Sequence, residues 1–421
     1  MRRSADVDAG VDAEPGGGED MGEDRSTAEI RQASTRRAHL ALREAEQPLS
    51  IAELVAATGL SRPTVLSVLD DLTARGLVVP AAPAEEPGPG RPARRLRLDP
   101  DAAHVAGLDL GARSVRAVLA DLTGTVLARS TVGLDPEDLL GSLRHALEEV
   151  DAGPDAAPLG AVGLSVPGLL AADGSVGSSL ALPALAGRDL ARELAEVLEA
   201  PVVLENDVKL AALAEHRLGA EADGPAADGL VLLRIGHRIS VAIMVHGQIL
   251  QGAHRLAGEL GTQRGMRWTA GSRRGRLVWS TGDEARPLLE RAATGDADAQ
   301  QEVRAFCEEI APRLAGLLLA VDPEMVVVGG GLSRAGEALL GPLRAALGSQ
   351  LTGPGRPRLV PAALPADGSL VGALGRGFEH GSARIVGVPD VPAPWERIRR
   401  TLPSDPLTPD PRTSTDPEGR R

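Results

Sequence analysis

The stretch SIAELVAATGLSRPTVLSVLDDLTARGLVV, residues 50–79, decides the fold of the N-terminal part of the chain. Apolar residues recur in it at spacings of three and four, which predicts helices at residues 51–58 and 62–75. Between them, Gly59 can take the positive φ of a tight turn, and Ser61 can cap the second helix. Two short helices joined by such a turn indicate a helix-turn-helix.

The second of these helices has the pattern of a DNA-recognition helix. Val65, Leu69 and Leu72 share one face, so the intervening polar residues fall on the opposite face. A further helix is predicted just upstream, at residues 36–43. In helix-turn-helix proteins the N-terminal part of the second helix contacts base edges. The DNA contacts predicted here are Ser61, Arg62, Thr64 and Ser67.

A basic segment follows the helices. Residues 90–98 read GRPARRLRL, in which Arg alternates with Leu as expected for a β-wing that lies along a phosphate backbone. The chain carries a formal charge of −13, yet residues 31–98 hold ten Arg against seven acidic residues. The alternative is an ordinary helical hairpin with a solvated Arg strand. The predicted wing contacts are Arg91, Arg94, Arg95 and Arg97.

Composition narrows the kind of nucleic acid and the compartment. With no Tyr and only two Phe, the chain lacks the aromatic platforms of single-strand and RNA binders, so duplex DNA is the expected partner. Cys307, the single cysteine, lies in an apolar helical pattern and is interpreted as a core residue. No signal peptide or membrane span is recognisable, and a cytoplasmic protein is expected.

Composition also suggests the domain boundaries. Residues 1–30 are acidic and residues 387–421 are rich in proline, and both are predicted to be disordered tails. The winged helix-turn-helix is assigned to residues 31–98. Beyond it, apolar runs of strand length alternate with helical patterns, which indicates an α/β body. The strand-like runs are residues 105–110, 117–122, 160–166, 201–204, 230–235, 241–245 and 325–328.

Five short motifs follow one another in this body, and their order is more specific than any single one. They are Gly107-Leu108-Asp109-Leu110-Gly111, Gly163-Leu164-Ser165-Val166-Pro167-Gly168, Glu205-Asn206-Asp207, Ala257-Gly258-Glu259-Leu260-Gly261 and Val328-Gly329-Gly330-Gly331. With the helix-turn-helix, the chain resembles the ROK family of repressors and sugar kinases.

The resemblance implies the fold of the body. Two actin-like (ribonuclease H-like) ATPase-type α/β subdomains would enclose a cleft for a sugar or sugar phosphate. The first subdomain is assigned to residues 99–206 plus 365–386, because the chain returns to it near its end. The second is assigned to residues 207–364.

Both phosphate loops of the kinase members are altered in this sequence. The Asp-x-Gly-Gly-Thr loop of the kinases is Asp109-Leu110-Gly111-Ala112-Arg113 here, and the Gly-Thr-Gly-Ile-Gly loop is Gly236-His237-Arg238-Ile239-Ser240. A cradle of backbone N–H groups needs conformations that these replacements adopt only at a cost. We therefore expect no kinase activity, although the positive charge at Arg113, His237 and Arg238 could still attract an anion.

The predicted ligand residues are Asn206, Asp207 and Glu259. Asp207 is similar in position to the general base of the kinases and would be the catalytic residue if the chain were a kinase. Without working phosphate loops, all three residues would instead form hydrogen bonds with ligand hydroxyls. The alternative is that Asn206 or Asp207 simply caps the following helix.

The zinc site of some family members has lost its ligands. Thr262 stands at the position of the family's histidine, and the loop at residues 263–276 contains no cysteine. Tetrahedral zinc needs thiolate or imidazole donors, so no metal and no other cofactor is expected. The arginines from Arg264 to Arg276 are interpreted as a solvated loop or as a site for an acidic effector.

The leading hypothesis is a ROK-type transcriptional regulator, a repressor that binds a double-stranded DNA operator. Two-fold operators imply a homodimer or higher homo-oligomer. A carbohydrate effector in the cleft would change its DNA affinity, with no role for a membrane. The alternatives are an ATP-dependent sugar kinase and a DNA-binding protein that acts without a ligand.

Overall fold

The fold is described from a computed structural model of residues 1–421. It describes residues 20–81, 94–151, 153, 157–219, 227–273, 275–282, 284–353 and 355–402. The chain divides between Leu98 and Asp99 into two compact units, each treated by itself below. No helix within these described ranges has the length and apolar character needed to cross a membrane.

The first unit is a winged helix. Its helices α1 (Asp20–Glu44), α2 (Ile51–Thr58) and α3 (Arg62–Ala74) pack beside a small antiparallel sheet, in which β3 (Arg95–Leu98) lies between β1 (Leu49–Ser50) and β2 (Val78–Pro80). The predicted helix-turn-helix is thus confirmed. Its core is aliphatic and consists mainly of Leu54, Val65, Val68, Leu69, Leu72, Leu96 and Leu98.

Local capping explains where these two helices begin and end. The Ser50 hydroxyl accepts a hydrogen bond from the Glu53 N–H, and a Glu53 carboxylate oxygen accepts one from the Ser50 N–H, which closes a capping box. Gly59 ends α2 with φ of 67°. Ser61 caps α3 by accepting a hydrogen bond from the Thr64 N–H. The roles predicted for Gly59 and Ser61 are confirmed.

Helix α1 is longer than predicted. It begins at Asp20 rather than at residue 36, so the predicted disordered tail over residues 1–30 is wrong from Asp20 onward. The residues before Asp20 lie outside the described ranges. Between Glu23 and Glu44 the sequence contains neither Gly nor Pro. Once the packed end of a helix is nucleated, each added residue costs little, and the helix propagates through a polar segment.

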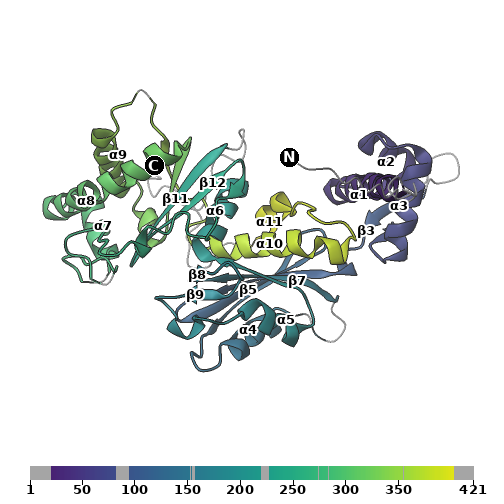
Figure 1. The fold of residues 1–421 in the computed structure, drawn as a ribbon, viewed down its shortest axis with the longest axis horizontal. Coiled ribbons are helices and arrows are strands. Elements are labelled where there is room, and N and C mark those ends of the chain that lie inside the picture. The colour runs from purple at the N-terminus through teal and green to yellow at the C-terminus, as the bar shows by residue number, and fades with distance from the viewer. Residues whose placement is uncertain are drawn as a thin grey trace, which may run out of the picture. The chain divides into compact units, whose positions relative to one another are not determined.

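The second unit begins with a five-stranded sheet. Its strands β4 (His104–Leu110), β5 (Ser114–Asp121), β6 (Val126–Gly133), β7 (Leu159–Val166) and β10 (Val202–Asn206) are arranged in the order β10-β7-β4-β5-β6. Helices α4 (Leu139–Glu148) and α5 (Leu190–Leu198) cover one face, and α10 (Gly368–Ile385) covers the other (Figure 1). A small hairpin pairs β8 (Leu169–Leu170) with β9 (Val176–Ser178).

Close contact between this sheet and α10 explains the glycines of two motifs. A Cβ on Gly163 would lie 1.7 Å from the Ala373 carbonyl oxygen, and one on Gly107 would lie 2.8 Å from the Leu374 nitrogen. Only glycine permits so close an approach of helix and strand backbones. As predicted, the end of the chain therefore returns to the first subdomain.

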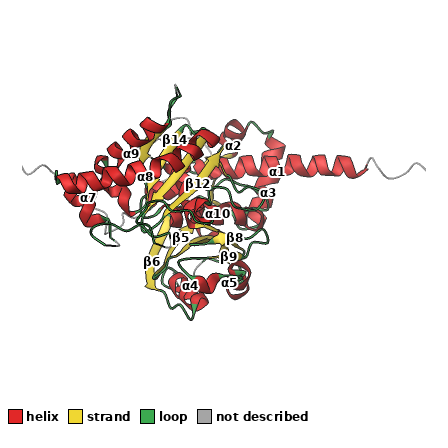
Figure 2. Ribbon diagram, turned by 60° about the vertical axis from the view of Figure 1, so that its left-hand side comes forward, coloured by secondary structure: helices red, strands yellow, loops and turns green. Residues whose placement is uncertain are grey.

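A second five-stranded sheet carries the rest of the unit, in the order β13-β12-β11-β14-β15. Helices α7 (Arg286–Ala293), α8 (Ala297–Val321) and α9 (Glu337–Gln350) stand along one side of it (Figure 2), and α6 (Asp207–Leu218) packs on the other. These layers confirm the predicted α/β class. The strands are β11 (Gly229–Ile235), β12 (Ile239–Val245), β13 (Gln248–Ile249), β14 (Met325–Gly329) and β15 (Arg358–Pro361).

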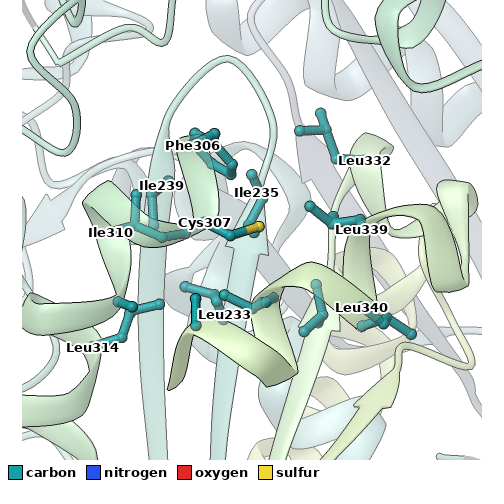
Figure 3. Close-up of a cluster of buried hydrophobic side chains, with 14 of the residues drawn as sticks. Leu233, Ile235, Ile239, Phe306, Cys307, Ile310, Leu314, Leu332, Leu339 and Leu340 are labelled. Atoms are coloured by element: carbon teal, nitrogen blue, oxygen red, sulfur yellow. The ribbon is translucent and has the colours of Figure 1, made fainter. Parts of the chain in front are cut away.

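Cys307 is a core residue, as interpreted from the sequence. It lies on α8 among aliphatic side chains from β11, β12 and α9 (Figure 3). Burial raises the pKa of its thiol to about 12, so the thiolate is not formed near neutral pH. The residue fills space rather than supplying a nucleophile.

The C-terminal segment is ordered further than predicted. Residues 387–402 pack on the body, and α11 (Trp395–Thr401) is their helical part, so the predicted disordered tail is wrong up to Leu402. Trp395 lies directly over Gly375 of α10, where a Cβ would approach its ring to 1.9 Å. The segment is rich in proline, yet it contains a few apolar residues that become buried. Their burial outweighs the entropy cost of ordering the segment.

Candidate functional site

The exposed face of α3 carries most of the predicted DNA contacts. Arg62 and Ser67 are exposed, while Val65 and Leu69 are buried against α1 and α2. Thr64 is half-buried, and its hydroxyl lies 2.8 Å from that of Ser61. Ser61 and Thr64 therefore stabilise the start of the helix, and Arg62 and Ser67 are the side chains free to reach bases.

Leu66 is a further candidate that the sequence reading missed. It is 38% exposed on α3, beside Arg62 and Ser67 on the outer face, whereas the other large aliphatic residues of the helix are buried. The signal was available, since Leu66 does not fit the spacing of Val65, Leu69 and Leu72. An aliphatic side chain at this place could contact a thymine methyl group.

The wing arginines differ in whether they already form hydrogen bonds within the protein. Arg95 donates to the Pro48 carbonyl oxygen at 2.6 Å and to a Glu53 carboxylate oxygen at 3.0 Å, so it ties β3 to the start of α2. Arg97 is exposed and donates to the carbonyl of its neighbour Leu98. Arg94 is exposed and has no partner among the described residues. Arg91 lies outside the described residues.

A cavity of about 1180 Å³ opens in the second unit between its two sheets. The three predicted ligand residues all line it. Asn206 and Asp207 stand where β10 passes into α6, and Glu259 comes from the loop after β13. The structure therefore brings together residues that are about fifty positions apart in the sequence.

Asn206 performs the capping role that was left open as an alternative. Its Oδ1 accepts hydrogen bonds from the N–H groups of Val208 and Lys209, at 2.9 and 3.1 Å. Its Nδ2 donates to the Gly168 carbonyl at 2.9 Å. Both ends of the amide are occupied, so Asn206 shapes the cavity wall and fixes Gly168, the last residue of the second family motif.

Asp207 is paired with an arginine inside the cavity. Arg234, at the end of β11, forms an ion pair and hydrogen bond with Oδ2 of Asp207. Burial raises the pKa of Asp207, and the positive charge of Arg234 opposes that shift. Arg234 therefore occupies the carboxylate oxygen to which a substrate hydroxyl would otherwise bind. The sequence reading did not single out Arg234.

Asp109 of the altered first phosphate loop is also bound by other side chains of the fold. Arg116 donates to its Oδ2 at 2.6 and 3.1 Å, and Ser165 donates to its Oδ1 at 2.6 Å. Arg116 also pairs with Asp367, just before α10. Neither Asp109 nor Arg113 lines the cavity. This aspartate therefore joins strands and helix instead of facing a ligand.

A buried polar network lies beneath Glu259. Lys209 donates to the Gln251 side chain at 3.0 Å and to the Arg255 carbonyl at 3.3 Å, and Glu205 accepts from Gln251 and Arg255. Burial raises the pKa of Glu259 to about 7, with Lys209 lowering it and the charges of Asp207 and Glu205 raising it further. Glu259 can thus donate or accept a hydrogen bond near neutral pH.

Two buried tryptophans anchor the loop at residues 263–285, which stands in place of the family's zinc site and is called the tryptophan-held loop below. Trp268 and Trp279 are 3% and 7% exposed, and the ring centroid of Trp279 lies 4.7 Å from that of Phe306 on α8. The loop offers neither thiolate nor imidazole, so its donors do not fit tetrahedral zinc. No cluster of metal-ligating side chains occurs in the part of the chain that the structure describes.

Comparison with known proteins identifies the family. The ROK family matches residues 105–270 and 263–375, which is more than half of the chain, and the IclR helix-turn-helix domain matches residues 40–81. The chain belongs to the ROK family. The N-terminal helix-turn-helix on a ROK body makes this protein a DNA-binding transcriptional regulator of the ROK type.

The relatives of this ROK protein include both kinases and repressors. It is 28% identical over 262 residues to the N-acetylgalactosamine kinase of Shewanella sp. (strain ANA-3), covering 55% of this chain and 83% of the kinase. It is 25% identical over 324 residues to the xylose repressor of Caldicellulosiruptor bescii, covering 68% of this chain and 80% of the repressor.

A solved structure agrees with the fold of the whole ROK regulator. The crystal structure of a ROK family transcriptional regulator, a homologue of the E. coli Mlc protein, aligns with a TM-score of 0.65. The alignment covers 88% of this chain and 98% of that one, at 20% sequence identity. At this identity the likeness shows the fold, namely actin-like subdomains together with the helix-turn-helix.

Proposed function

We propose that this ROK regulator is a repressor that binds a two-fold operator as a homodimer and is released by a carbohydrate effector bound in its cleft. A recognition helix that reads one half-site needs a second copy for the other half-site. The xylose repressors among the relatives support repression and a sugar effector. A ligand can release the operator only if it binds the DNA-free form more tightly.

The observation that carries the proposal is that arginines pair with both motif carboxylates, Asp109 and Asp207. A kinase of this type needs Asp207 to accept a proton and its phosphate loop to face the nucleotide. Here Arg234 holds Asp207, and Arg116 with Ser165 holds Asp109. We therefore propose that the cleft binds a ligand without transferring a phosphoryl group to it.

The cleft suits a polyhydroxylated ligand. Glu259 offers an acceptor and the guanidinium of Arg234 offers donors in the same cavity, while both oxygens of Asp207 already accept hydrogen bonds, from Arg234 and the Val208 N–H. Sugars are recognised by such mixed sets of donors and acceptors on an otherwise apolar lining. Glu259, which is half protonated near pH 7, can serve in either role.

The test is retardation of DNA fragments from the region upstream of the protein's own coding sequence. We expect the full chain to retard one such fragment, and xylose, N-acetylgalactosamine or another sugar to release it. Replacing Glu259 by Gln should weaken release at least tenfold, because a carboxylate hydrogen bond contributes about 1.5–3 kcal/mol. The exposed Glu290→Gln variant on α7 is the matched control. If no sugar releases the fragment, the effector part of the proposal is wrong.

A sugar kinase is the second candidate, favoured by the position of Asp207 in the cleft and by the kinase relatives. It predicts ATP-dependent phosphorylation of glucose or an N-acetylhexosamine that is abolished in Asp207→Asn. We expect no turnover above that of the Asp207→Asn variant. A difference of more than tenfold between the two proteins would reverse the ranking.

We also propose that the protein holds no structural zinc, because aromatic packing takes over the role of the metal in this loop. Chelation by EDTA should then leave the melting temperature unchanged. A metal-dependent transition in the folded protein would contradict this.

A further inference from the structure

We propose that the cleft contains a subsite for the phosphoryl group of its effector, formed by the side chains of Arg238 and Arg286, so that the effector is a phosphorylated compound. The inference rests on the proposed function, in which the cleft takes an effector. It adds the chemical class of that ligand. The contacts proposed for the sugar hydroxyls do not by themselves require a phosphoryl group on the ligand.

The subsite lies where the turn between β11 and β12 meets the tryptophan-held loop that precedes α7. The Leu277 N–H donates to the His237 carbonyl at 2.9 Å and so joins the loop to the turn. Arg238 and Arg286 both line the cavity from this joined wall.

The surroundings of Arg238 favour the binding of an anion. Its Nε is buried and has no hydrogen-bond partner among the described residues. The nearby positive charge of Arg276, together with burial, lowers the pKa of Arg238. An anion in the cavity would relieve both the lost hydration and the repulsion.

Arg286 adds a second cation from a different element. It is the first residue of α7, is exposed, and has no partner among the described residues. No side chain caps this helix, so the positive end of its dipole has the same sign as the two arginines. Glu284 is the carboxylate at this wall, and it is exposed to solvent.

Arginine side chains differ from a glycine cradle in what they recognise. A cradle holds phosphate through backbone N–H groups, which the residues His237 and Ser240 disfavour here. Guanidinium groups bind a phosphate monoester through paired, charge-assisted hydrogen bonds and need no glycine. The cleft is thus built to hold a phosphoryl group that stays on the ligand.

Isothermal titration calorimetry of the full chain with inorganic phosphate and pyrophosphate tests this subsite, with chloride at matched ionic strength as the blank. We expect Arg238→Gln and Arg286→Gln each to weaken both anions at least tenfold. Arg238→Lys, which keeps the charge, should recover part of the loss. The control is Arg264→Gln, an exposed arginine of the same loop that does not line the cavity.

Two results would overturn the inference. One is that the wild type binds neither anion at millimolar concentration, and the other is that the Arg238 and Arg286 variants bind as well as the wild type. Melting temperatures within about 2 °C of the wild type show that the variants are folded. Retardation of the upstream fragment by the same proteins separates the two proposals, because loss of the phosphate subsite leaves DNA binding intact.

Discussion

Glu259 is half-buried and His39 is buried, and the pKa of each side chain is shifted in the direction that favours its neutral form. Burial raises the pKa of the Glu259 carboxyl to about 7, and burial lowers the pKa of the His39 imidazole to about 3, with the charge of Arg43 contributing. Each shift makes the stability of the folded chain depend on pH, in opposite directions.

For Glu259, the folded state holds the proton more tightly than the unfolded chain does. Stability from this residue is therefore full below about pH 4.5 and is lost as the pH rises to about 7. Glu259→Gln should reduce the fall in melting temperature between pH 5 and pH 8. All three tryptophans lie in the α/β body, so their fluorescence reports this transition. The variant at the exposed Glu284, Glu284→Gln, should behave like the wild type, and an unchanged pH profile in Glu259→Gln would refute the prediction.

For His39, the unfolded chain binds the proton more tightly. Its contribution to stability is present above pH 6.5 and falls by about 1.4 kcal/mol per pH unit as the pH drops toward 3. We compare the urea midpoint of His39→Leu with that of the wild type at two pH values. The difference, variant minus wild type, should be more positive at pH 5 than at pH 7.5. Far-UV circular dichroism measures it, and the tryptophan transition of the body serves as the internal control. Parallel behaviour at both pH values would be evidence against burial of a neutral His39.

Single residues in the cleft show what sequence alone could predict. Asn206, Asp207 and Glu259 were placed together by the order of the family motifs, and the structure brings them to one cavity. The pairing of Arg234 with Asp207 could not be predicted. It depends on β11 and the start of α6, which come together only in the folded unit.

At the scale of elements, α10 and the first sheet are in close backbone contact. Gly163→Ala would place a methyl group 1.7 Å from a backbone oxygen of α10, so the helix must shift. We expect a loss of at least about 2 kcal/mol in the free energy of unfolding, comparable to overpacking in a core. Gly316→Ala on α8, with nothing within 4 Å, should be neutral or stabilise by up to about 1 kcal/mol. Urea denaturation measures both, and equal values would disprove the close packing.

The wing makes a separate prediction at this scale. Arg94 is exposed and uncommitted among the described residues, whereas Arg95 already ties β3 to the cap of α2. Arg94→Ala should lower the slope of log K against log salt concentration by about 1, the effect of one phosphate contact. Arg95→Ala should in addition lower the stability of the winged helix. Arg304→Ala on α8 is the control, and a salt slope unchanged by Arg94→Ala would exclude a phosphate contact.

Elements with strong periodicity and caps were predictable, and elements that depend on tertiary contact were not. α2 and α3 were predicted to within one residue because Ser50, Gly59 and Ser61 mark their ends. α11 could not be predicted because its burial depends on contact between Trp395 and Gly375, which lies twenty residues earlier in the chain, on another helix. The extension of α1 could not be predicted because an acidic composition does not distinguish a disordered tail from the polar end of a helix that propagates from its packed part.

At the scale of the whole molecule, a body built like a sugar kinase is joined to a winged helix that reads DNA. The body has a cleft, and Asp109 and Asp207 are paired with arginines. In the proposed function, binding energy in the cleft shifts an equilibrium instead of driving a reaction. Regulation would then depend on the difference in ligand affinity between the DNA-bound and DNA-free forms, which is a coupling free energy.

The most direct measurement is a fluorescence anisotropy titration of an upstream duplex fragment in the presence of excess unrelated DNA. We predict that the wild type binds the fragment specifically. The double variant Arg62→Ala, Ser67→Ala should bind at least tenfold more weakly, since each base contact contributes about 1–3 kcal/mol. Failure of the wild type to bind any upstream fragment at low salt, or equal binding by the double variant, would contradict DNA recognition through α3.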